Sequence, residues 1–157
     1  MAIKIDDDYI TLLNKAVTME ITAIIQYMTQ HSKASKIELQ KKLSDLEVIT
    51  AKNIYSVIGG KLKVTALQEM KHAEVIAERI YVIGGEATAT ALPPVIGDSI
   101  EDFLINDLKA ESDTMELYRK IIKVATERGD ITTKKLFEDI YMAEEEHYWM
   151  FDEYKKD

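Results

Sequence analysis

Two Glu-x-x-His pairs are the residues of this sequence best suited to chemistry. Glu69 precedes His72, and Glu144 precedes His147, by three positions, and the chain has only three histidines. Positions i and i+3 lie on one face of a helix, so each pair can present a carboxylate and an imidazole together. Two such pairs, with one glutamate from each of two further helices, can build a two-metal site inside a four-helix bundle. The pairs therefore predict a metal site if two further glutamates are present.

The two further glutamates lie in matching places. Glu20 and Glu111 each interrupt an apolar helical stripe, and each is followed seven residues later by a tyrosine, Tyr27 or Tyr118. Seven residues are nearly two helical turns, so each tyrosine lies on the face of its own glutamate. Together with the two pairs, these residues make two copies of one helical hairpin.

Four carboxylates and two imidazoles are the donors that two adjacent cations of intermediate hardness need. Without a metal, four carboxylates in one core would repel each other and take up protons, so a purely structural role would be costly. The sequence has no cysteine, so only oxygen and nitrogen ligands are available. Fe, Mn and Zn all accept such a donor set.

Long apolar-periodic segments with little glycine or proline predict an all-α fold. We expect helices over about 8–32, 61–83, 99–128 and 131–154, with a break at the Gly59-Gly60 pair. The glutamates of the first hairpin are 49 residues apart and those of the second are 33 apart. We therefore expect an extra helical insertion at 33–60, between the first two helices.

Residues 84–98 form a long connection that has no periodicity and holds both prolines. If the two hairpins are related by a two-fold axis, this connection must span ~40 Å, because a helix rises about 1.5 Å per residue. About 14 extended residues reach ~46 Å. An up-down-up-down bundle would need only about 2–8 residues. We therefore predict a four-helix bundle with a long crossover between its second and third helices, as a single domain over 1–157.

Charge and composition restrict the partners. The net charge of −8 and the pI of about 5.0 give a surface that repels phosphate backbones and attracts cations. The first eight residues contain no apolar signal segment, and no apolar run approaches the ~18 residues of a membrane span. We expect a cytoplasmic protein with no nucleic-acid and no membrane partner.

The sequence resembles bacterioferritins and related ferritin-like di-iron proteins over nearly all of its length. The resemblance lies in the segments LNKAVTMEITAIIQYM, EMKHAEVIAERIYVIGG, DLKAESDTMELY and EEEHYWM. It implies a ferritin-like bundle that binds two Fe ions per chain. The implied ligands are Glu20 and Glu111 as terminal carboxylates, Glu69 and Glu144 as bridges, and His72 and His147 with one iron each.

The family implies that ferrous iron is oxidised with dioxygen or peroxide and stored as a ferric mineral inside a hollow homo-oligomer. Met70 lies where bacterioferritins place the methionine that binds haem at a subunit two-fold; the alternative is a flexible core or interface methionine. Tyr27 is either a functional neighbour of the metals or a packing residue. His31 is either a further ligand or a partly exposed residue near a helix end. The sequence ends at Asp157, so we expect no counterpart of the short fifth helix of 24-subunit cages.

Three functions remain open from the sequence. The first is a ferroxidase. The second is a rubrerythrin-like peroxidase or a manganese catalase, which uses the same kind of two-metal site to consume peroxide. The third is a metal-free helical interaction module that uses residues 33–60 as its contact surface.

Overall fold

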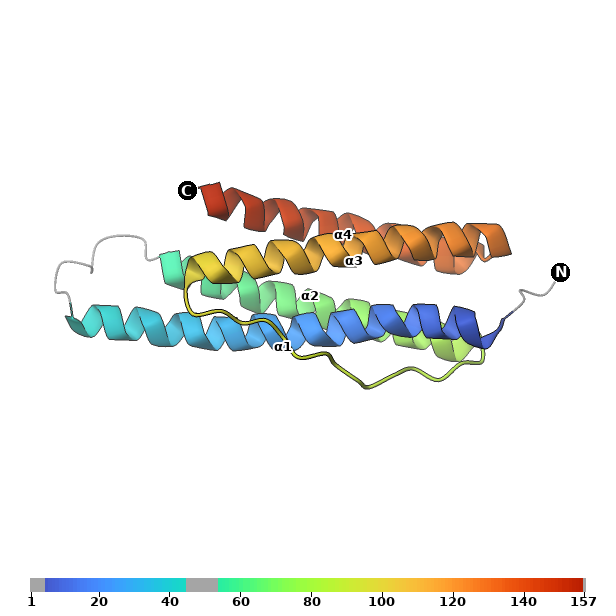
Figure 1. Cartoon of the computed structure of the whole chain (residues 1–157), viewed down its shortest axis with the longest axis horizontal. Helices are drawn as coiled ribbons and strands as arrows, with labels where there is room; N and C mark the ends of the chain where they lie inside the picture. The colour runs from blue at the N-terminus through green and yellow to red at the C-terminus, as the bar shows by residue number, and fades with distance from the viewer. Residues whose placement is uncertain (1–4, 45–53, 157) are drawn as a thin grey trace.

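The computed structural model describes residues 5–44 and 54–156 of the chain. Four helices run along a common axis (Figure 1). Contacts are most numerous within two hairpins, α1 with α2 and α3 with α4, and the hairpins meet through α1 with α3 and α2 with α4. The prediction of an all-α four-helix bundle is confirmed. The helices are α1 (Asp7–Ser44), α2 (Ile54–Val82), α3 (Ile100–Arg128) and α4 (Ile131–Lys156).

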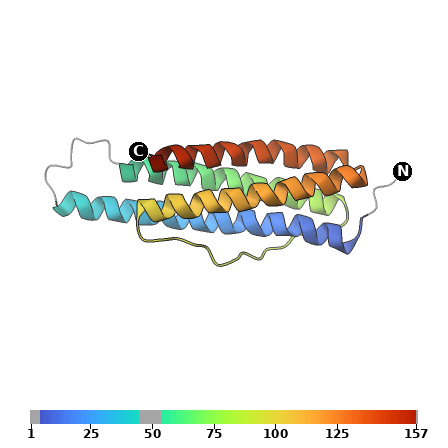
Figure 2. The same ribbon diagram turned by 45° about the horizontal axis from the view of Figure 1, so that its top comes forward.

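The long crossover between α2 and α3 is confirmed. The chain leaves α2 at one end of the bundle and enters α3 at the other, lying along α1 between them (Figures 1 and 2). Polar side chains on one face of α1 bind the crossover backbone between residues 86 and 96, with donors and acceptors 2.8–3.2 Å apart. A stripe of polar residues spaced by four or eight positions on α1 thus positions this segment. These residues are Asn14, Thr22, Gln26 and Gln30.

The ends of α3 lie within one residue of the predicted bounds, and capping residues fix both of them. Ser99 accepts a hydrogen bond from the backbone N–H of Asp102, and the Asp102 carboxylate accepts one from the Ser99 backbone, which is a capping box. Gly129 ends the helix in the left-handed region, with φ of 69°. Gly84, just past α2, has φ of 87°. Local sequence signals thus mark the start and end of α3 and the end of α2.

The predicted break at Gly59-Gly60 is wrong, because both glycines lie inside α2. The flanking Ile58 and Leu62 are 1% and 0% exposed. Burying a side chain of this size stabilises the fold by about 1.5–3 kcal/mol. An interior glycine costs only about 1 kcal/mol relative to alanine. The packing of α2 against its neighbours therefore keeps the helix continuous.

The region predicted as an insertion is helical where the structure describes it, but it adds no separate helix there. Residues 33–44 continue α1, and residues 54–60 begin α2. The extra length of the first hairpin therefore lengthens its two helices. The remaining part of the predicted insertion, 45–53, lies outside the described residues.

Two apolar clusters fill the bundle, one on each side of a polar layer. The first joins the start of α1 to the end of α2, with Tyr118 and Phe137 from the second hairpin. The second joins the middle of α1 to the first half of α2, with Phe103 and Phe151. The polar layer between them holds the predicted metal-binding residues. Within the described residues, no helix combines the length and the apolar character needed to cross a bilayer.

Candidate metal centre

All six predicted ligands meet in the polar layer between the two apolar clusters. The four glutamates are only 1% or 2% exposed, and His147 is 4% exposed. Each helix contributes at its inner face, which is why the residues interrupt apolar stripes in the sequence. The six are Glu20 from α1, Glu69 and His72 from α2, Glu111 from α3, and Glu144 and His147 from α4.

The six residues form two overlapping groups of four. One contains Glu20 and His72, the other contains Glu111 and His147, and both contain Glu69 and Glu144. Within each group the candidate ligand atoms lie within 4.8 Å of one another. We call Glu69 and Glu144 the shared glutamates. This overlap is the geometry in which two carboxylates can contact two cations at once.

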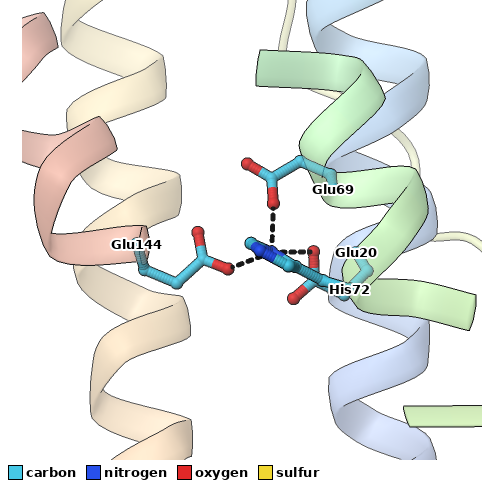
Figure 3. Close-up of side chains that lie close together, drawn as sticks. All are labelled: Glu20, Glu69, His72 and Glu144. Carbon is cyan, nitrogen blue, oxygen red and sulfur yellow. Dashed lines mark hydrogen bonds and ion pairs between the residues drawn. The ribbon is translucent and has the colours of Figure 1, made fainter. Parts of the chain in front are cut away.

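The imidazoles point into the centre through Nδ1. His72 Nδ1 lies 2.8 Å from Glu69 Oε2 and 2.8 Å from Glu144 Oε1. His147 Nδ1 lies 3.0 Å from Glu69 Oε1 and 3.3 Å from Glu144 Oε2. The two rings are 6.1 Å apart between centroids. Figure 3 shows His72 surrounded by carboxylates that come from α1, α2 and α4.

The pKa values of Glu20, Glu111 and the two histidines are shifted by their buried surroundings. Burial, together with the charges of the shared glutamates, raises the pKa of Glu20 and of Glu111 well above the usual range. Burial alone would lower the pKa of the histidines. Hydrogen bonds to the carboxylates instead raise the pKa of His147 to about 9 and raise that of His72 as well. The carboxylates thus draw protons onto the imidazoles, and a metal ion that binds there must displace them.

Two buried oxygens test whether the centre fits metal ions. Glu69 Oε1 and Glu144 Oε1 accept no hydrogen bond, although each lies close to a histidine Nδ1. A ring N–H has one hydrogen to donate, and each histidine hydrogen-bonds to the glutamate three residues before it. A buried carboxylate oxygen without a partner is costly. Both unpartnered atoms belong to the shared glutamates, so the donor set fits two cations.

The two tyrosines predicted beside the centre are both buried there. Tyr27 donates a hydrogen bond to Glu111, and Tyr118 donates one to Glu20. Each tyrosine therefore binds the glutamate of the other hairpin, not the one on its own helix. Sequence spacing placed the tyrosines on the correct face but did not identify their partners.

Comparison with known proteins identifies the family. A family model described as a ferritin-like domain matches residues 55–157. A bacterioferritin from Desulfovibrio desulfuricans is 37% identical over 139 residues, which are 88% of this chain and 69% of the relative. This chain belongs to the bacterioferritin family. A Rhodobacter capsulatus bacterioferritin is 31% identical over 143 residues, covering 90% of this chain and 79% of that protein.

Two solved bacterioferritin structures have the same fold. The X-ray structure of the D. desulfuricans protein, described with its diiron site in different catalytic states, has a TM-score of 0.81 at 33% identity. It covers 95% of this chain and 78% of that one. The R. capsulatus structure has a metal-free dinuclear site and a haem iron on a crystallographic special position. Its TM-score is 0.83 at 28% identity, covering 98% and 86% of the two chains.

Two other residues singled out in the sequence lie away from the six. His31 Nδ1 lies 2.7 Å from the backbone oxygen of Gly59, so this histidine joins α1 to α2. It belongs to neither group of candidate metal ligands. Met70 follows Glu69 but points outward and is 54% exposed. Met70 thus lies on the surface of this chain.

One buried acid near the centre was missed. Asp107 on α3 is 0% exposed and accepts a hydrogen bond of 2.8 Å from Gln26 Nε2. Its Oδ2 has no hydrogen-bond partner in the part of the chain that the structure describes. Burial raises its pKa to about 7, although the hydrogen bond from Gln26 acts in the opposite direction. Its position four residues before Glu111, on the same inner face, was the signal that could have identified it.

Proposed function

We propose that this chain binds two Fe(II) ions and oxidises them with dioxygen or peroxide, for iron storage or detoxification. One observation carries the proposal: the two groups of candidate ligands share Glu69 and Glu144. Shared carboxylates hold two cations side by side, so that two one-electron donors can serve one two-electron oxidant. The diiron site of the D. desulfuricans relative supports this function.

The proposed ligand assignment follows the two groups. Glu20 and His72 bind one iron, Glu111 and His147 bind the other, and the shared glutamates contact both. Each histidine binds through Nδ1, the ring atom that faces the carboxylates. Mn and Zn accept the same oxygen and nitrogen donors, so the donor set alone does not select Fe.

Iron is the substrate of the proposed reaction. Two Fe(II) ions give one electron each to dioxygen, which takes up two protons and becomes hydrogen peroxide. With hydrogen peroxide as the oxidant, the two electrons and two protons yield two molecules of water. The residues contribute by holding the ions adjacent, by releasing protons from the histidines when iron binds, and by excluding bulk water from a buried layer.

The tyrosines are proposed to orient the terminal carboxylates. Burial, with the nearby charges of Glu111 and Asp107, raises the pKa of Tyr27 well above the usual value of 10. The Tyr27 hydroxyl therefore keeps its hydrogen and remains a donor to Glu111 at any physiological pH. Such contacts to a ligand typically change metal affinity or activity by about 10–100-fold.

We also propose that Met70 binds haem between two copies of the chain. Met70 and Leu67 are 54% and 52% exposed on the same helix, which leaves an apolar surface for a partner. A thioether is a weak ligand, so haem at a two-fold needs a second copy. The haem iron on a special position in the R. capsulatus relative supports this arrangement. A homo-oligomer is therefore part of the proposal, and we propose a cytoplasmic location from the charge and composition of the chain.

Aerobic addition of Fe(II) to the metal-free protein tests the ferroxidase proposal. We expect rapid oxidation of about two irons per chain, lost in Glu69→Ala and in Glu144→Ala. Glu145→Ala is the matched control, because Glu145 is the exposed neighbour of Glu144. Oxidation no faster than in buffer, or equal rates in all variants, would contradict the proposal.

Two alternatives have distinct outcomes. A peroxidase or manganese catalase would turn over peroxide repeatedly and leave no ferric mineral. A metal-free interaction module would contain no Fe, Mn or Zn after reconstitution and metal analysis. The overlap of the two ligand groups favours a two-metal protein over the interaction module.

A further inference from the structure

One contact breaks the symmetry of the metal centre. The two hairpins repeat the same glutamates, histidines and tyrosines. Gln68 on α2, however, places its side-chain oxygen 3.0 Å from His147 Nε2 on α4. The position equivalent to Gln68 in the second hairpin, directly before Glu144, is Ala143, which has no polar side chain. His72 therefore has no corresponding partner from the second hairpin.

The contact acts on the ring nitrogen that is remote from the carboxylates. The Gln68 oxygen can only accept a hydrogen bond, so His147 Nε2 donates to it. When a metal ion displaces the hydrogen on Nδ1, the neutral imidazole that remains keeps its hydrogen on Nε2 and presents its Nδ1 lone pair to the ion. Nδ1 is the atom that faces Glu69 and Glu144. Gln68 thus selects the tautomer that can bind a metal ion through Nδ1 and fixes the orientation of the ring.

His72 differs from His147 in the neighbours of its Nδ1 and in having no hydrogen-bond partner at Nε2 within the described ranges 5–44 and 54–156. Its Nδ1 faces Glu20, Glu69 and Glu144, at 3.8, 2.8 and 2.8 Å. Among the described residues, no side chain hydrogen-bonds to its Nε2, and its side chain is 12% exposed against 5% for His147. The ring of His72 is thus held only from the side on which a metal ion would bind.

We propose that Gln68 is a positioning residue that makes the two metal positions unequal. The position of Glu111 and His147 binds its ion more tightly and retains it, and the position of Glu20 and His72 binds more weakly and exchanges its ion. This inference rests on the proposed two-metal function. It adds that one Fe(II) ion is held as a resident and that the other enters and leaves.

Anaerobic titration of the full-length, metal-free protein with Co(II) tests the inference, because Co(II) absorbs visible light when bound and no oxidation is involved. The wild type should bind one Co(II) per chain tightly and a second more weakly. Gln68→Ala should weaken the tight step by about 10-fold and leave the weak step unchanged. Gln68→Glu keeps an acceptor oxygen and should restore the tight step. Lys63→Ala, at an exposed position on the same helix, is the control and should match the wild type.

One further single variant and two double variants assign the steps to positions. Ala143→Gln should tighten the weak step by giving His72 an acceptor of its own. In a Glu20→Ala background, which leaves the Glu111 and His147 position, Gln68→Ala should still weaken the remaining ion by about 10-fold. In a Glu111→Ala background, Gln68→Ala should have no effect. Circular dichroism on each variant verifies that the bundle is folded.

The outcomes separate the inference from the function on which it rests. Two bound Co(II) ions with the same affinities in wild type and Gln68→Ala would overturn the inference and leave the two-metal function standing. A Gln68→Ala effect that appears in the Glu111→Ala background would also overturn it. No Co(II) binding by the wild type would overturn the proposed function and the inference together.

Discussion

Tyr27 on α1 donates its hydroxyl hydrogen to Glu111 on α3, and not to Glu20, the glutamate two turns away on its own helix. Tyr118 on α3 makes the reciprocal hydrogen bond to Glu20 on α1. Tyr27 belongs to the apolar cluster that contains Phe103 and Phe151, and Tyr118 belongs to the cluster that contains Phe137. The metal centre is thus also the place where the two hairpins are joined by buried hydrogen bonds.

Removal of one tyrosine hydroxyl should weaken one metal position. Tyr27→Phe leaves Glu111 without its donor, and we expect about 10-fold weaker binding of Co(II) at the Glu111 position. Tyr118→Phe should have the same effect at the Glu20 position. Anaerobic titration measures both. Tyr81→Phe is the control, because Tyr81 is 54% exposed; equal affinities in Tyr27→Phe and Tyr81→Phe would show that the hydroxyl does not hold the carboxylate.

Neutralising a terminal carboxylate should stabilise the metal-free protein. Burial and the charges of the shared glutamates raise the pKa of Glu111, so its ionised form destabilises the fold at pH values above the pKa of the unfolded chain. The side chain of Glu111→Gln cannot ionise, so we expect a metal-free protein that is more stable than the wild type near pH 8. Addition of Zn(II) should raise the stability of this variant by less than it raises the stability of the wild type.

Thermal unfolding with and without Zn(II) measures both effects of Glu111→Gln. The control is Glu116→Gln, which neutralises an exposed carboxylate on the same helix. If Glu111→Gln lowers the midpoint of the metal-free protein more than Glu116→Gln does, the centre is not under electrostatic strain.

The six candidate ligands could be found in the sequence because each lies on a helical face of regular period. The i, i+3 pairs and the repeated spacing from glutamate to tyrosine depend only on helix geometry. The crossover followed from chain length, since residues 84–98 are too many for a turn. The ends of α3 followed from local caps at Ser99 and Gly129.

Features that depend on distant packing were not predictable in this way. The Gly59-Gly60 pair looks like a helix end locally, but burial of the flanking Ile58 and Leu62 keeps α2 continuous. The partner of Tyr27 is 84 residues away, on a helix whose rotation the sequence does not specify. The Gln68 contact with His147 also joins two hairpins, across 79 residues.

Asp107 should make the stability of the metal-free protein depend on pH. Its pKa is raised by burial from about 3.8 in the unfolded chain to about 7 in the fold, so folding takes up a proton between these values. The fold therefore loses stability as the pH rises through this window, by at most about 4 kcal/mol. Asp107→Asn keeps the shape without the charge, and its stability advantage over the wild type should grow from pH 4 to pH 7 and then stay constant.

Urea unfolding of the metal-free protein at several pH values gives the difference between Asp107→Asn and the wild type. Asp113→Asn, at an exposed position on the same helix, is the control and should show a nearly constant difference. A constant difference for Asp107→Asn as well would mean that Asp107 is ionised in the fold throughout.

Asp130 joins three helices at the end of the bundle remote from the start of α3. It caps α4 by accepting from the Thr133 backbone N–H at 3.0 Å and the Thr133 hydroxyl at 2.6 Å. It also accepts from the hydroxyl of Tyr9 on α1 at 3.0 Å and from Arg79 on α2 at 2.7 Å. The carboxylate is 0% exposed and the Arg79 side chain is 12% exposed, so this is a buried ion pair with every oxygen satisfied.

Loss of the Asp130 carboxylate should therefore be among the costliest single changes outside the metal centre. Asp130→Ala leaves the Arg79 charge and the Tyr9 hydroxyl buried without their partner, and we expect a loss of about 3–5 kcal/mol in the free energy of unfolding. Burial alone would raise the pKa of Asp130, but hydrogen bonds from Thr133, Arg79 and Tyr9 lower it overall. Its contribution is thus present above the pKa of the unfolded chain and is lost as the pH falls through the lower pKa of the fold.

Urea unfolding near neutral pH measures the loss in Asp130→Ala. Asp139→Ala is the control, because the exposed pair of Asp139 with Lys135 contributes at most about 0.5 kcal/mol. Similar losses in the two variants would mean that the buried cluster stabilises the bundle no more than a surface pair does.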